Sequence, residues 1–381
     1  MPATARNDDR GDSTMKVIIV GGGIGGLAAA VAFHQRGWQV EILERTPEFT
    51  EIGAGLSIQP NGLRALDTLG LGDPLRSGGL ADPLAGIRCA SGGWLIRNDI
   101  DDLKRRFGQW VTVHRAALVD LLRAAVPAQA LRPGTEVRHV QPDGTVRHSG
   151  GTSTADLVVG ADGVHSVTRH SLWPRIPGPR YVGYTAWRFI APPQPVEGSV
   201  ETWGRGERFG HVPMPDGRVY CYLLANAPIG SRTHLDQLRQ RFAHWHGPIP
   251  TLLNTAGEEA VLQHDTYELP RLPTFVSGKV AILGDAAHAM TPNLGQGACQ
   301  ALEDAVTLAA AADTLGVRAG LEEYDRVRRP RTQMIARRSR QAGAPAHWTS
   351  PPLTALRDVA LPILPNALFN RSITPAYTWT L

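Results

Sequence analysis

A run of β-branched residues at positions 17–20 ends directly in a glycine cluster at 21–26. Such a run is typical of a strand that is buried on both faces of a parallel sheet. The alanine-rich stretch from 25 to about 36 then predicts a helix that Gly37 closes, and residues 39–43 predict a second strand. This βαβ unit restricts the chain to an α/β fold built around a parallel sheet.

The glycine cluster GGGIGG fits the pattern G-x-G-x-x-G between a strand and a helix. Its missing side chains allow a tight turn and let a pyrophosphate reach the helix N-terminus. Glu44 ends the second strand 23 residues after Gly21, where a carboxylate can accept hydrogen bonds from ribose hydroxyls. The alternative, a glycine-rich turn without a ligand, is disfavoured by this strand, helix and acid together. We predict a dinucleotide site, NAD or FAD, that includes Gly21, Gly23, Gly25, Gly26, Glu44 and Arg45.

The chain changes character twice along its length. Two further strand-and-turn patterns occur at 157–163 and 280–285, and helices are predicted at about 297–312 and 319–340. Between them, residues 181–270 are rich in aromatic residues and proline and alternate in short runs, which indicates an antiparallel sheet. We therefore predict a discontinuous dinucleotide-binding domain (15–78, 101–178 and 271–340), a substrate-binding sheet domain (79–100 and 179–270) and a C-terminal segment (341–381).

Composition and charge exclude several other classes of protein. The 381 residues include 39 Lys and Arg against 35 Asp and Glu, a net charge of +4 that is scattered along the chain and disfavours a nucleic-acid partner. Cys89, Cys221 and Cys299 form no CxxC pair, as expected of a reduced intracellular protein without a metal site. The uncharged stretch 17–33 is interrupted by five glycines and predicts no membrane span. The first fourteen residues are polar and lack the apolar core of a signal peptide, so we expect a loose tail and a cytoplasmic location.

Two later segments add to the glycine cluster: GADG at 160–163, and GDAAH at 284–288 followed by Pro292 and by GQG at 295–297. The three segments in this order resemble the FAD-dependent monooxygenases of the p-hydroxybenzoate hydroxylase class, often called group A. The sequence is most similar to the small salicylate and urate hydroxylase-like members, over residues 15 to about 340. The resemblance implies a Rossmann-like FAD-binding domain interleaved with a mostly antiparallel β-sheet substrate domain, followed by C-terminal helices.

The resemblance also assigns cofactor contacts. The glycine cluster and Glu44 would hold the ADP half of FAD, Arg115 would lie near the pyrophosphate and ribityl chain, and Asp285 would bind a ribityl hydroxyl. Asp162 would assist both FAD and NAD(P)H binding. The helix that Gly295–Gly297 open would present its N-terminus to the flavin. The remaining predicted contacts on this segment are Pro292, Gly295, Gln296 and Gly297.

The reaction implied by the resemblance consumes NADH or NADPH, which binds transiently, and O2. A flavin C4a-hydroperoxide then transfers one oxygen atom to a small aromatic or heteroaromatic substrate, such as a natural-product intermediate. Four alternatives remain open: an epoxidase or other oxygenase with a non-aromatic substrate, a flavoprotein oxidoreductase without oxygenation, an NAD-dependent dehydrogenase, and a flavoprotein sensor. No heptad pattern selects between a monomer and a dimer.

The sheet domain supplies the candidate catalytic and substrate-binding residues. Tyr220 and Tyr222 lie on one face of a predicted strand, His211 lies on the preceding one, and the three are expected to line one pocket. His211 is the candidate general base, with packing inside the sheet as its alternative. Tyr220 resembles the substrate-contacting tyrosine of urate hydroxylase-like enzymes, but Gly210 or His211 falls where an arginine is expected, which argues against urate. The remaining candidates for substrate contact are Trp187 and Arg188.

Two further groups are predicted to play no catalytic part. His288 lies within the GDAAH segment and is expected to be structural. The arginine-rich helix at 326–340 is expected to present a solvated face or to lie as a lid over the FAD domain.

Overall fold

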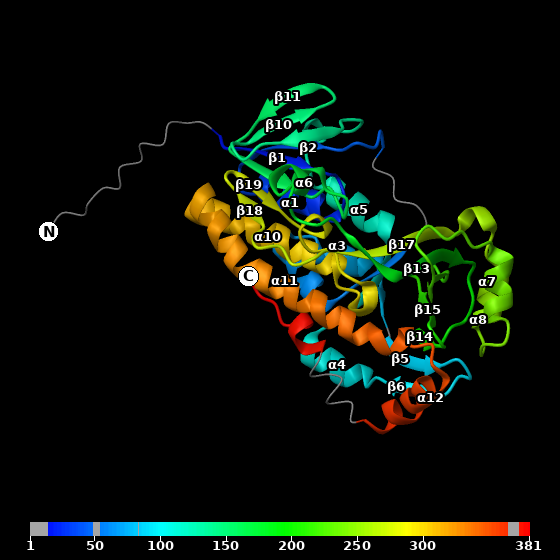
Figure 1. Cartoon of the computed structure of the whole chain (residues 1–381). Helices are drawn as coiled ribbons and strands as arrows, with labels where there is room; N and C mark the ends of the chain where they lie inside the picture. Colours follow the sequence, from blue (N-terminus) through cyan, green and yellow to red (C-terminus); the bar gives the residue numbers. More distant parts are fainter. Residues whose placement is uncertain (1–13, 49–53, 83, 365–372) are drawn as a thin grey trace.

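The computed structural model describes residues 14–48, 54–82, 84–364 and 373–381. Apart from Thr14, the predicted N-terminal tail lies outside these residues. The chain folds around two large sheets with helices between and beside them, which confirms the predicted α/β class (Figure 1).

The first large sheet is six-stranded and mostly parallel. Val17 and Ile19 of its β1 strand pack against helices, whereas Ile18 and Val20 pack against a small three-stranded sheet on the other face. Both faces are therefore covered, as the β-branched run predicts. Its strand order is β18 (Val276–Ser277), β19 (Val280–Ile282), β12 (Leu157–Gly160), β1 (Lys16–Val20), β2 (Gln39–Leu43) and β8 (Leu131–Arg132), with only β18 antiparallel.

Helices cover one face of this sheet, and two small sheets lie beside it. The main covering helices are α1 (Ile24–His34), α2 (Pro60–Thr68), α5 (Arg115–Ala124) and α10 (Gly297–Leu315). The small sheet on the other face contains β9 (Val137–Val140), β10 (Thr145–His148) and β11 (Gly151–Thr154). The second small sheet contains β3 (Gly55–Ile58), β7 (Val111–His114) and β4 (Leu80–Ala81). Short helices complete this region: α3 (Gly72–Gly78), α4 (Ile100–Phe107), η1 (Ala128–Ala130), α6 (Val167–Leu172), α9 (Asp285–His288) and η3 (Pro292–Leu294).

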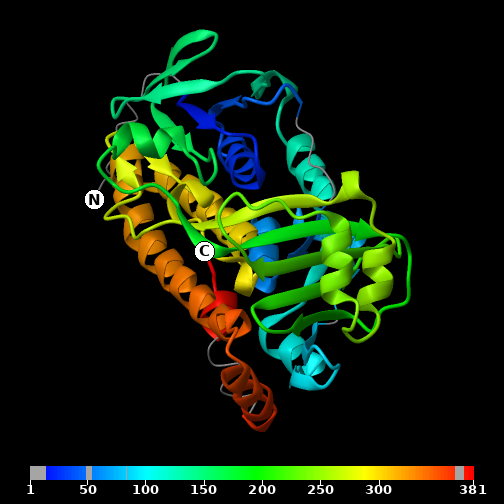
Figure 2. The same cartoon turned by 45° about the vertical axis from the view of Figure 1, so that its right-hand side comes forward.

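The second large sheet has seven strands, and only its β14–β5 pair is parallel. Two helices, α7 (Leu235–Phe242) and α8 (Ile249–Asn254), cover one of its faces, seen in yellow-green in Figure 2. We call this the outer face, and the opposite one the inner face. The strand order is β17 (Leu262–Glu268), β13 (Arg180–Ala191), β16 (Val219–Asn226), β15 (Glu207–Pro213), β14 (Ser199–Trp203), β5 (Leu84–Cys89) and β6 (Trp94–Arg97), and η2 (Glu258–Ala260) precedes β17.

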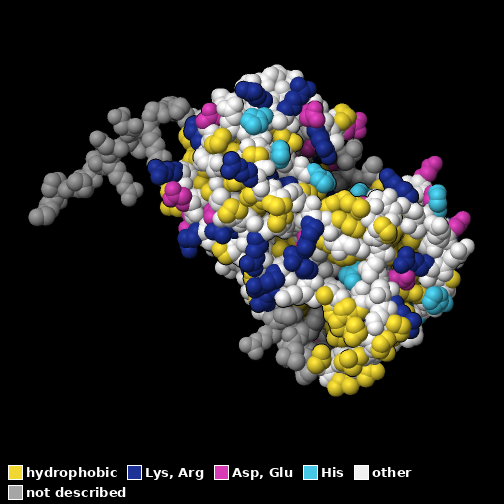
Figure 3. All heavy atoms as spheres, in the orientation of Figure 1, with side chains coloured by type: hydrophobic (Ala, Val, Ile, Leu, Met, Phe, Trp, Pro, Cys, Tyr) yellow, Lys and Arg dark blue, Asp and Glu magenta, His cyan; other side chains and the backbone are white. Residues whose placement is uncertain are grey.

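The C-terminal part begins with α11 (Val317–Gly343), which packs along α10. It continues through η4 (Ala344–His347), α12 (Pro351–Ala360) and η5 (Leu361–Ile363). Apolar side chains of α12 and η5 are exposed and gather at the lower end of the molecule in Figure 3, among them Leu356, Val359 and Ile363. Among the described residues, no helix is both long and apolar enough to cross a membrane.

Candidate functional site

The glycine turn between β1 and α1 has the geometry that a pyrophosphate requires. Gly21 adopts φ +101°, and a Cβ atom there would lie 2.5 Å from the Ala161 carbonyl oxygen. A Cβ on Gly26 would lie 2.0 Å from the Gly21 carbonyl oxygen, so only glycine lets α1 approach β1 this closely. A Cβ on Gly23, in contrast, would meet no described atom within 4 Å. Gly21 and Gly26 therefore shape the turn, and Gly23 leaves room for a ligand at the helix N-terminus.

Glu44 lies beside this turn, at the end of β2. Its Oε2 atom accepts a hydrogen bond from the Gly22 N–H at 2.7 Å, and its Oε1 atom accepts from the Thr46 N–H and hydroxyl at 2.9 Å. The carboxylate is thus held at the rim of the turn, where ribose hydroxyls can reach it. Arg45 follows and is exposed. Gly25 packs against Leu283, where an added Cβ would lie 2.8 Å from the Cδ1 atom, and so fits helix packing better than ligand contact.

Asp162 follows β12, next to the glycine turn. Its carboxylate accepts hydrogen bonds from the Ser166 hydroxyl at 2.6 Å and from the Thr168 N–H at 2.9 Å. The side chain therefore orders the loop that leads into α6. Arg169, which the sequence analysis missed, donates to the carbonyl oxygens of Ala286 at 2.9 Å and Val164 at 2.7 Å. This buried guanidinium ties the loop after β12 to α9, and no local sequence pattern marks it.

Asp285 begins α9 at the carboxyl end of β19, and its side chain is exposed. Ligands of open α/β sheets bind at this end of the strands, so the carboxylate is free to accept hydrogen bonds from a sugar-like chain. The preceding Gly284 adopts φ +58°, and its N–H donates to Asp304 at 3.0 Å. His288 also contacts the Asp304 carboxylate, at 2.6 Å, and is buried, which fits the structural role predicted for it.

In the segment 292–297, which leads into α10, backbone groups are open to a ligand and buried side chains hold the backbone in place. Gly295 adopts φ +61°, and a Cβ on Gly297 would meet no described atom within 4 Å. The Gln296 side chain is buried and accepts hydrogen bonds from Asn61 at 2.9 Å and Gln300 at 2.7 Å. Gln296 therefore presents only its backbone to a cofactor. Pro292 begins η3, one turn earlier. The positive end of the 19-residue α10 helix can stabilise negative charge on a flavin.

A buried ionic cluster anchors this segment to α11. Arg328 of α11 is fully buried, and its Nε atom donates to Asp304 Oδ1 at 2.7 Å. Burial acts to raise the pKa of Asp304, but His288 and Arg328 outweigh it and lower the pKa to about 2. The prediction of a solvated arginine face is therefore wrong at Arg328, whereas Arg326 on the same helix is exposed and pairs with Glu323.

The inner face of the seven-stranded sheet carries a row of polar side chains across four strands. Strand pairing aligns Arg188 of β13, Tyr222 of β16, Gly210 of β15 and Glu201 of β14. The Tyr222 ring lies across Gly210, where an added Cβ would be 1.9 Å from the ring Cζ atom. The Tyr222 hydroxyl donates to Glu201 Oε2 at 2.8 Å. The absence of a side chain at Gly210 thus lets Tyr222 reach Glu201 across one strand.

Arg208 lies next to this row and was missed by the sequence analysis. It precedes Gly210 by two residues on β15, so both share the inner face. Its side chain is only 2% exposed, and Nη1 donates to Glu201 Oε1 at 3.3 Å. The prediction that this strand lacks an arginine near the tyrosines is therefore wrong. The arginine was expected at position 210 or 211, whereas it lies at 208 on the same face.

Tyr184 connects the inner face with the segment that opens α10. Arg208 lies over the Tyr184 ring, 5.8 Å from its centroid, and His347 of η4 stacks on the same ring at 3.9 Å. Burial raises the pKa of Tyr184 to about 12 although Arg208 and the Asn293 side chain act to lower it. Asn293 belongs to η3. The inner face therefore lies beside the predicted flavin segment.

Tyr220 lies one row further along the inner face and contacts the small β3–β7–β4 sheet. A Cβ on Gly55 of β3 would lie 2.6 Å from the Tyr220 Cβ and Cγ atoms. Burial raises the pKa of Tyr220, while the positive charges of Arg188 and Arg115 act to lower it. Arg115 begins α5, and its backbone N–H donates to the Ala54 carbonyl at 2.9 Å. The predicted residues Arg115, Arg188, Tyr220 and Tyr222 are thus brought together.

His211 and Trp187 face the other way. His211 pairs with Cys221, and Trp187 pairs with Leu223. Cys221, Leu223 and Trp187 belong to the apolar cluster that packs under α7 and α8. His211 is 2% exposed and Trp187 is 1% exposed. The prediction that His211 shares a pocket with Tyr220 and Tyr222 is wrong, because side chains alternate along a strand and His211 has the opposite parity. Trp187 packs between the sheet and its covering helices.

The burial of His211 predicts an acid-sensitive fold. Burial, with smaller effects from His246 and Arg88, lowers the pKa of His211 from 6.5 to about 4. The unfolded chain binds this proton first, so stability is complete above pH 6.5 and declines as the pH falls toward 4, by at most roughly 3 kcal/mol. We expect His211→Leu to remove this decline and to leave activity at neutral pH intact.

The check is the urea midpoint measured at several pH values between 4 and 8. His244→Leu serves as the control, because His244 is exposed and should leave the pH dependence unchanged. If His211→Leu unfolds with the wild-type pH dependence, or loses activity at neutral pH, His211 is not a buried packing residue.

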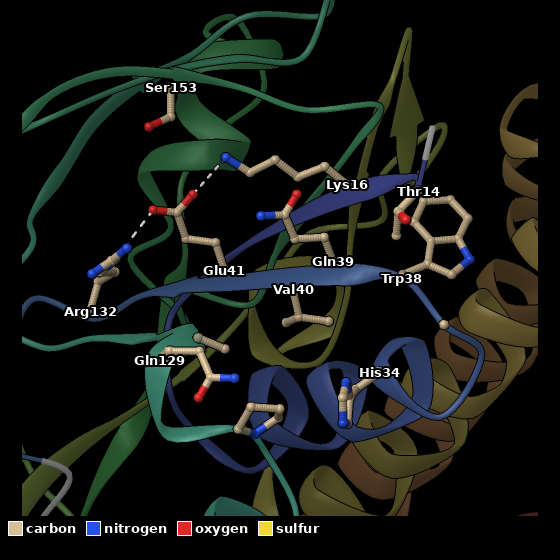
Figure 4. Close-up of a pocket in the computed structure, with 13 residues that line it drawn as sticks. Thr14, Lys16, His34, Trp38, Gln39, Val40, Glu41, Gln129, Arg132 and Ser153 are labelled. Atoms are coloured by element: carbon tan, nitrogen blue, oxygen red, sulfur yellow. Dashed lines mark ion pairs between the residues drawn. The ribbon is translucent and has the colours of Figure 1, made fainter. Parts of the chain in front are cut away.

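A surface hollow elsewhere does not fit a cofactor site. It has a volume of about 590 Å³ and lies near the amino ends of β1 and β2, away from the glycine turn (Figure 4). Its central carboxylate, Glu41, pairs with Lys16 at 2.8 Å and with Arg132 at 3.5 Å. The Glu41 carboxylate is therefore already paired with two cations of the hollow.

Comparisons with known proteins show the family to which this chain belongs. The family model described as "FAD binding domain" matches residues 14–339. The chain is 37% identical to the aurachin C monooxygenase/isomerase of Stigmatella aurantiaca, covering 88% of this chain and 90% of the relative. It is 36% identical to the 2-heptyl-3-hydroxy-4(1H)-quinolone synthase of Mycobacteroides abscessus, covering 82% and 85%.

Among solved structures, HpxO of Klebsiella pneumoniae in complex with FAD and uric acid superposes with a TM-score of 0.86 at 29% identity, covering 95% of this chain and 96% of HpxO. These matches confirm the predicted FAD cofactor and the predicted class of oxidoreductase. The chain belongs to the FAD-dependent monooxygenases of the FAD binding domain family.

Proposed function

We propose that this enzyme hydroxylates a small aromatic or heteroaromatic ring at the expense of NADH or NADPH and O2. The observation that carries the proposal is the inner face of the seven-stranded sheet, where Glu201, Arg208 and Tyr222 meet beside the segment that opens α10. Aromatic side chains there suit a flat ring, and the charged groups suit its polar substituents. FAD, when bound, supplies the reducing electrons and activates O2 for transfer of one oxygen atom.

The described residues fit FAD in two halves. Gly21, Gly23, Gly26 and Glu44 would hold the ADP half, and Asp285 would accept hydrogen bonds from the ribityl chain. The backbone from Gly295 to Gly297 would face the flavin ring. We further propose that the six-stranded sheet and its helices form the FAD domain, and that the seven-stranded sheet forms the substrate domain. The contributions of Arg45, Arg115 and Asp162 to cofactor binding stay within this proposal.

The relatives narrow the class of substrate. One takes its name from a 4-quinolone that carries a heptyl chain, and one structural neighbour binds uric acid. Both molecules are planar heterocycles with ring N–H groups. We propose that this enzyme accepts a planar ring with an acidic O–H or N–H group, such as a natural-product intermediate.

The test is a turnover assay on the FAD-loaded protein with 2-heptyl-4(1H)-quinolone, uric acid and salicylate. We expect at least one compound to accelerate NADH or NADPH oxidation and to gain one oxygen atom by mass spectrometry. If none of the compounds changes the rate of NAD(P)H oxidation and hydrogen peroxide is the only oxygen product, the protein is instead an oxidoreductase without oxygenation.

A further inference from the structure

We propose that Glu201 removes the acidic proton of the bound substrate through the hydroxyl of Tyr222, and that Arg208 stabilises the resulting substrate anion. The inference rests on the proposed function and deepens it, because it specifies how the ring becomes reactive. A ring that loses an O–H or N–H proton is richer in electrons and is a better nucleophile toward an oxygen donor.

The direction of the Tyr222 hydrogen bond supports this relay. A tyrosine hydroxyl has one proton to donate, and Tyr222 donates it to Glu201 at 2.8 Å. Its oxygen lone pairs are then left to accept a hydrogen bond. In the proposal, a substrate O–H or N–H donates to this oxygen. The Arg208 Nε and Nη2 atoms are unpartnered side-chain donors nearby within the described residues, and the proposal assigns them to the substrate anion.

The proton transfer balances without a redox partner. The substrate O–H or N–H bond breaks, and its proton passes to the Tyr222 oxygen. The original Tyr222 proton passes at the same time to Glu201 Oε2. The products are a substrate anion, a neutral tyrosine and a neutral glutamic acid, so one negative charge has moved from Glu201 to the substrate.

Arg208 is placed to follow that charge. Its side chain is 2% exposed, and its Nε and Nη2 atoms are buried with no hydrogen-bond partner within the described part of the chain. A buried donor without a partner costs free energy, so a ligand that supplies an acceptor is favoured here. The one Arg208 contact to Glu201 can persist while Nε and Nη2 bind the substrate oxyanion.

The groups around Glu201 include the Trp203 indole, which donates to Glu201 Oε1, and a further carboxylate near Tyr184, Glu268, which is paired with Arg180 and Arg340. Burial and the Glu201 carboxylate raise the pKa of Tyr222 well above its ordinary range, so Tyr222 stays protonated at rest and acts as a conduit. Burial and Arg208 lower the pKa of His347 to about 3, which keeps that imidazole neutral. Tyr184 is neutral as well, with a pKa of about 12. Arg188 pairs with Tyr222 across the strands and Arg208 contacts Glu201, and both cations favour an anionic ligand.

The first experiment needs no turnover. Oxidised, FAD-loaded protein is titrated anaerobically with 2-heptyl-4(1H)-quinolone between pH 6 and 10, and the ultraviolet spectrum of the bound ring reports its ionisation. We expect wild type to bind the anion at a pH at which the free ring is neutral. Glu201→Gln and Tyr222→Phe should bind the neutral ring, with affinities within about threefold of wild type.

Turnover supplies the second readout. A positioned base contributes about 10²–10⁴-fold, so Glu201→Gln should lower kcat for oxygen insertion by at least ~100-fold with little change in KM. The double variant should fall no further than either single variant, because both residues serve one transfer. Glu207→Gln is the matched control, since Glu207 lies on the outer face of the next strand and pairs with Arg241.

Gly210→Ala provides an independent variant that retains both relay residues. Its Cβ would displace the Tyr222 ring, so it should also lose the anion spectrum. FAD content and the melting temperature confirm that each variant is folded. If Glu201→Gln binds the anion and hydroxylates at the wild-type rate, the relay is wrong although the proposed function stands. If wild type shows no ligand-dependent oxidation with any compound, the proposed function itself is wrong.

Discussion

Replacing Arg328 by methionine is expected to lower the free energy of unfolding by about 3–5 kcal/mol. Arg328 is fully buried and donates to Asp304 at 2.7 Å, to the Gln300 side chain at 2.8 Å and to Glu303. Methionine fills a similar volume but removes one cationic partner from each of two buried carboxylates. As ion-pair partners among the described residues, Asp304 then keeps only His288, and Glu303 keeps only Arg331. The cost comes from the lost positive charge and the lost hydrogen bonds at these two carboxylates, because a buried ion pair with both partners present gains little over an apolar replacement.

The same substitution should weaken FAD binding. Asp304 also accepts the Gly284 N–H at 3.0 Å, and Glu303 accepts the Asn61 amide at 2.7 Å. Arg328 therefore holds two carboxylates that fix the backbone before Asp285 and the side chains behind the α10 N-terminus. We expect the variant to lose affinity for FAD although Arg328 itself lies behind the site.

Chemical unfolding of the apoprotein, followed by circular dichroism, measures the stability change. Arg326→Met is the matched control on the same helix, because Arg326 is exposed and pairs with the partly exposed carboxylate of Glu323. An exposed pair of this kind contributes up to about 1 kcal/mol. Equal stability losses in the two variants would show that the cluster around Arg328 is not an anchor.

The cofactor segments could be predicted from sequence because their constraints are local. The positive φ of Gly21 and the close approach of Gly26 to the Gly21 carbonyl arise within one short turn of the chain, although Gly21 also faces Ala161, which follows β12 and is distant in the chain. The strand, turn and helix around it follow from hydrophobic patterning over about ten residues.

The substrate face could not be predicted in the same way, because it depends on pairing between strands. From the sequence, His211 was expected beside Tyr222. In the structure Gly210 pairs with Tyr222 and His211 pairs with Cys221, so the His211 and Tyr222 side chains lie on opposite faces of the sheet. Shifting a register by one residue exchanges the two faces of a strand. Arg208 became visible as a partner of Glu201 only once β14, β15 and β16 were aligned. The burial of Arg328 could not be predicted for a related reason. The sequence of an arginine-rich helix does not show which of its arginines faces buried carboxylates.

The glycine turn separates ligand binding from folding. We expect Gly23→Ala to lower FAD affinity by at least ~100-fold, about 2.7 kcal/mol, while the apoprotein keeps nearly wild-type stability. A Cβ at Gly23 meets no described atom within 4 Å, so the fold has room for it. The pyrophosphate has no such room, because it must approach this backbone closely to reach the N-terminus of α1.

Gly26→Ala should mainly lower the stability of the apoprotein, in contrast to Gly23→Ala, which should mainly lower FAD affinity. Its Cβ would lie 2.0 Å from the Gly21 carbonyl oxygen, so α1 must move away from β1 and the apoprotein should lose about 1–3 kcal/mol. Flavin fluorescence quenching on the apoproteins gives the affinities, and urea unfolding gives the stabilities. Gly178→Ala, an exposed position that is also open within 4 Å and lies far along the chain, controls for a general glycine-to-alanine effect. Wild-type FAD affinity in Gly23→Ala would mean that the pyrophosphate does not bind over this turn, and the ADP half of the cofactor would then need a different site.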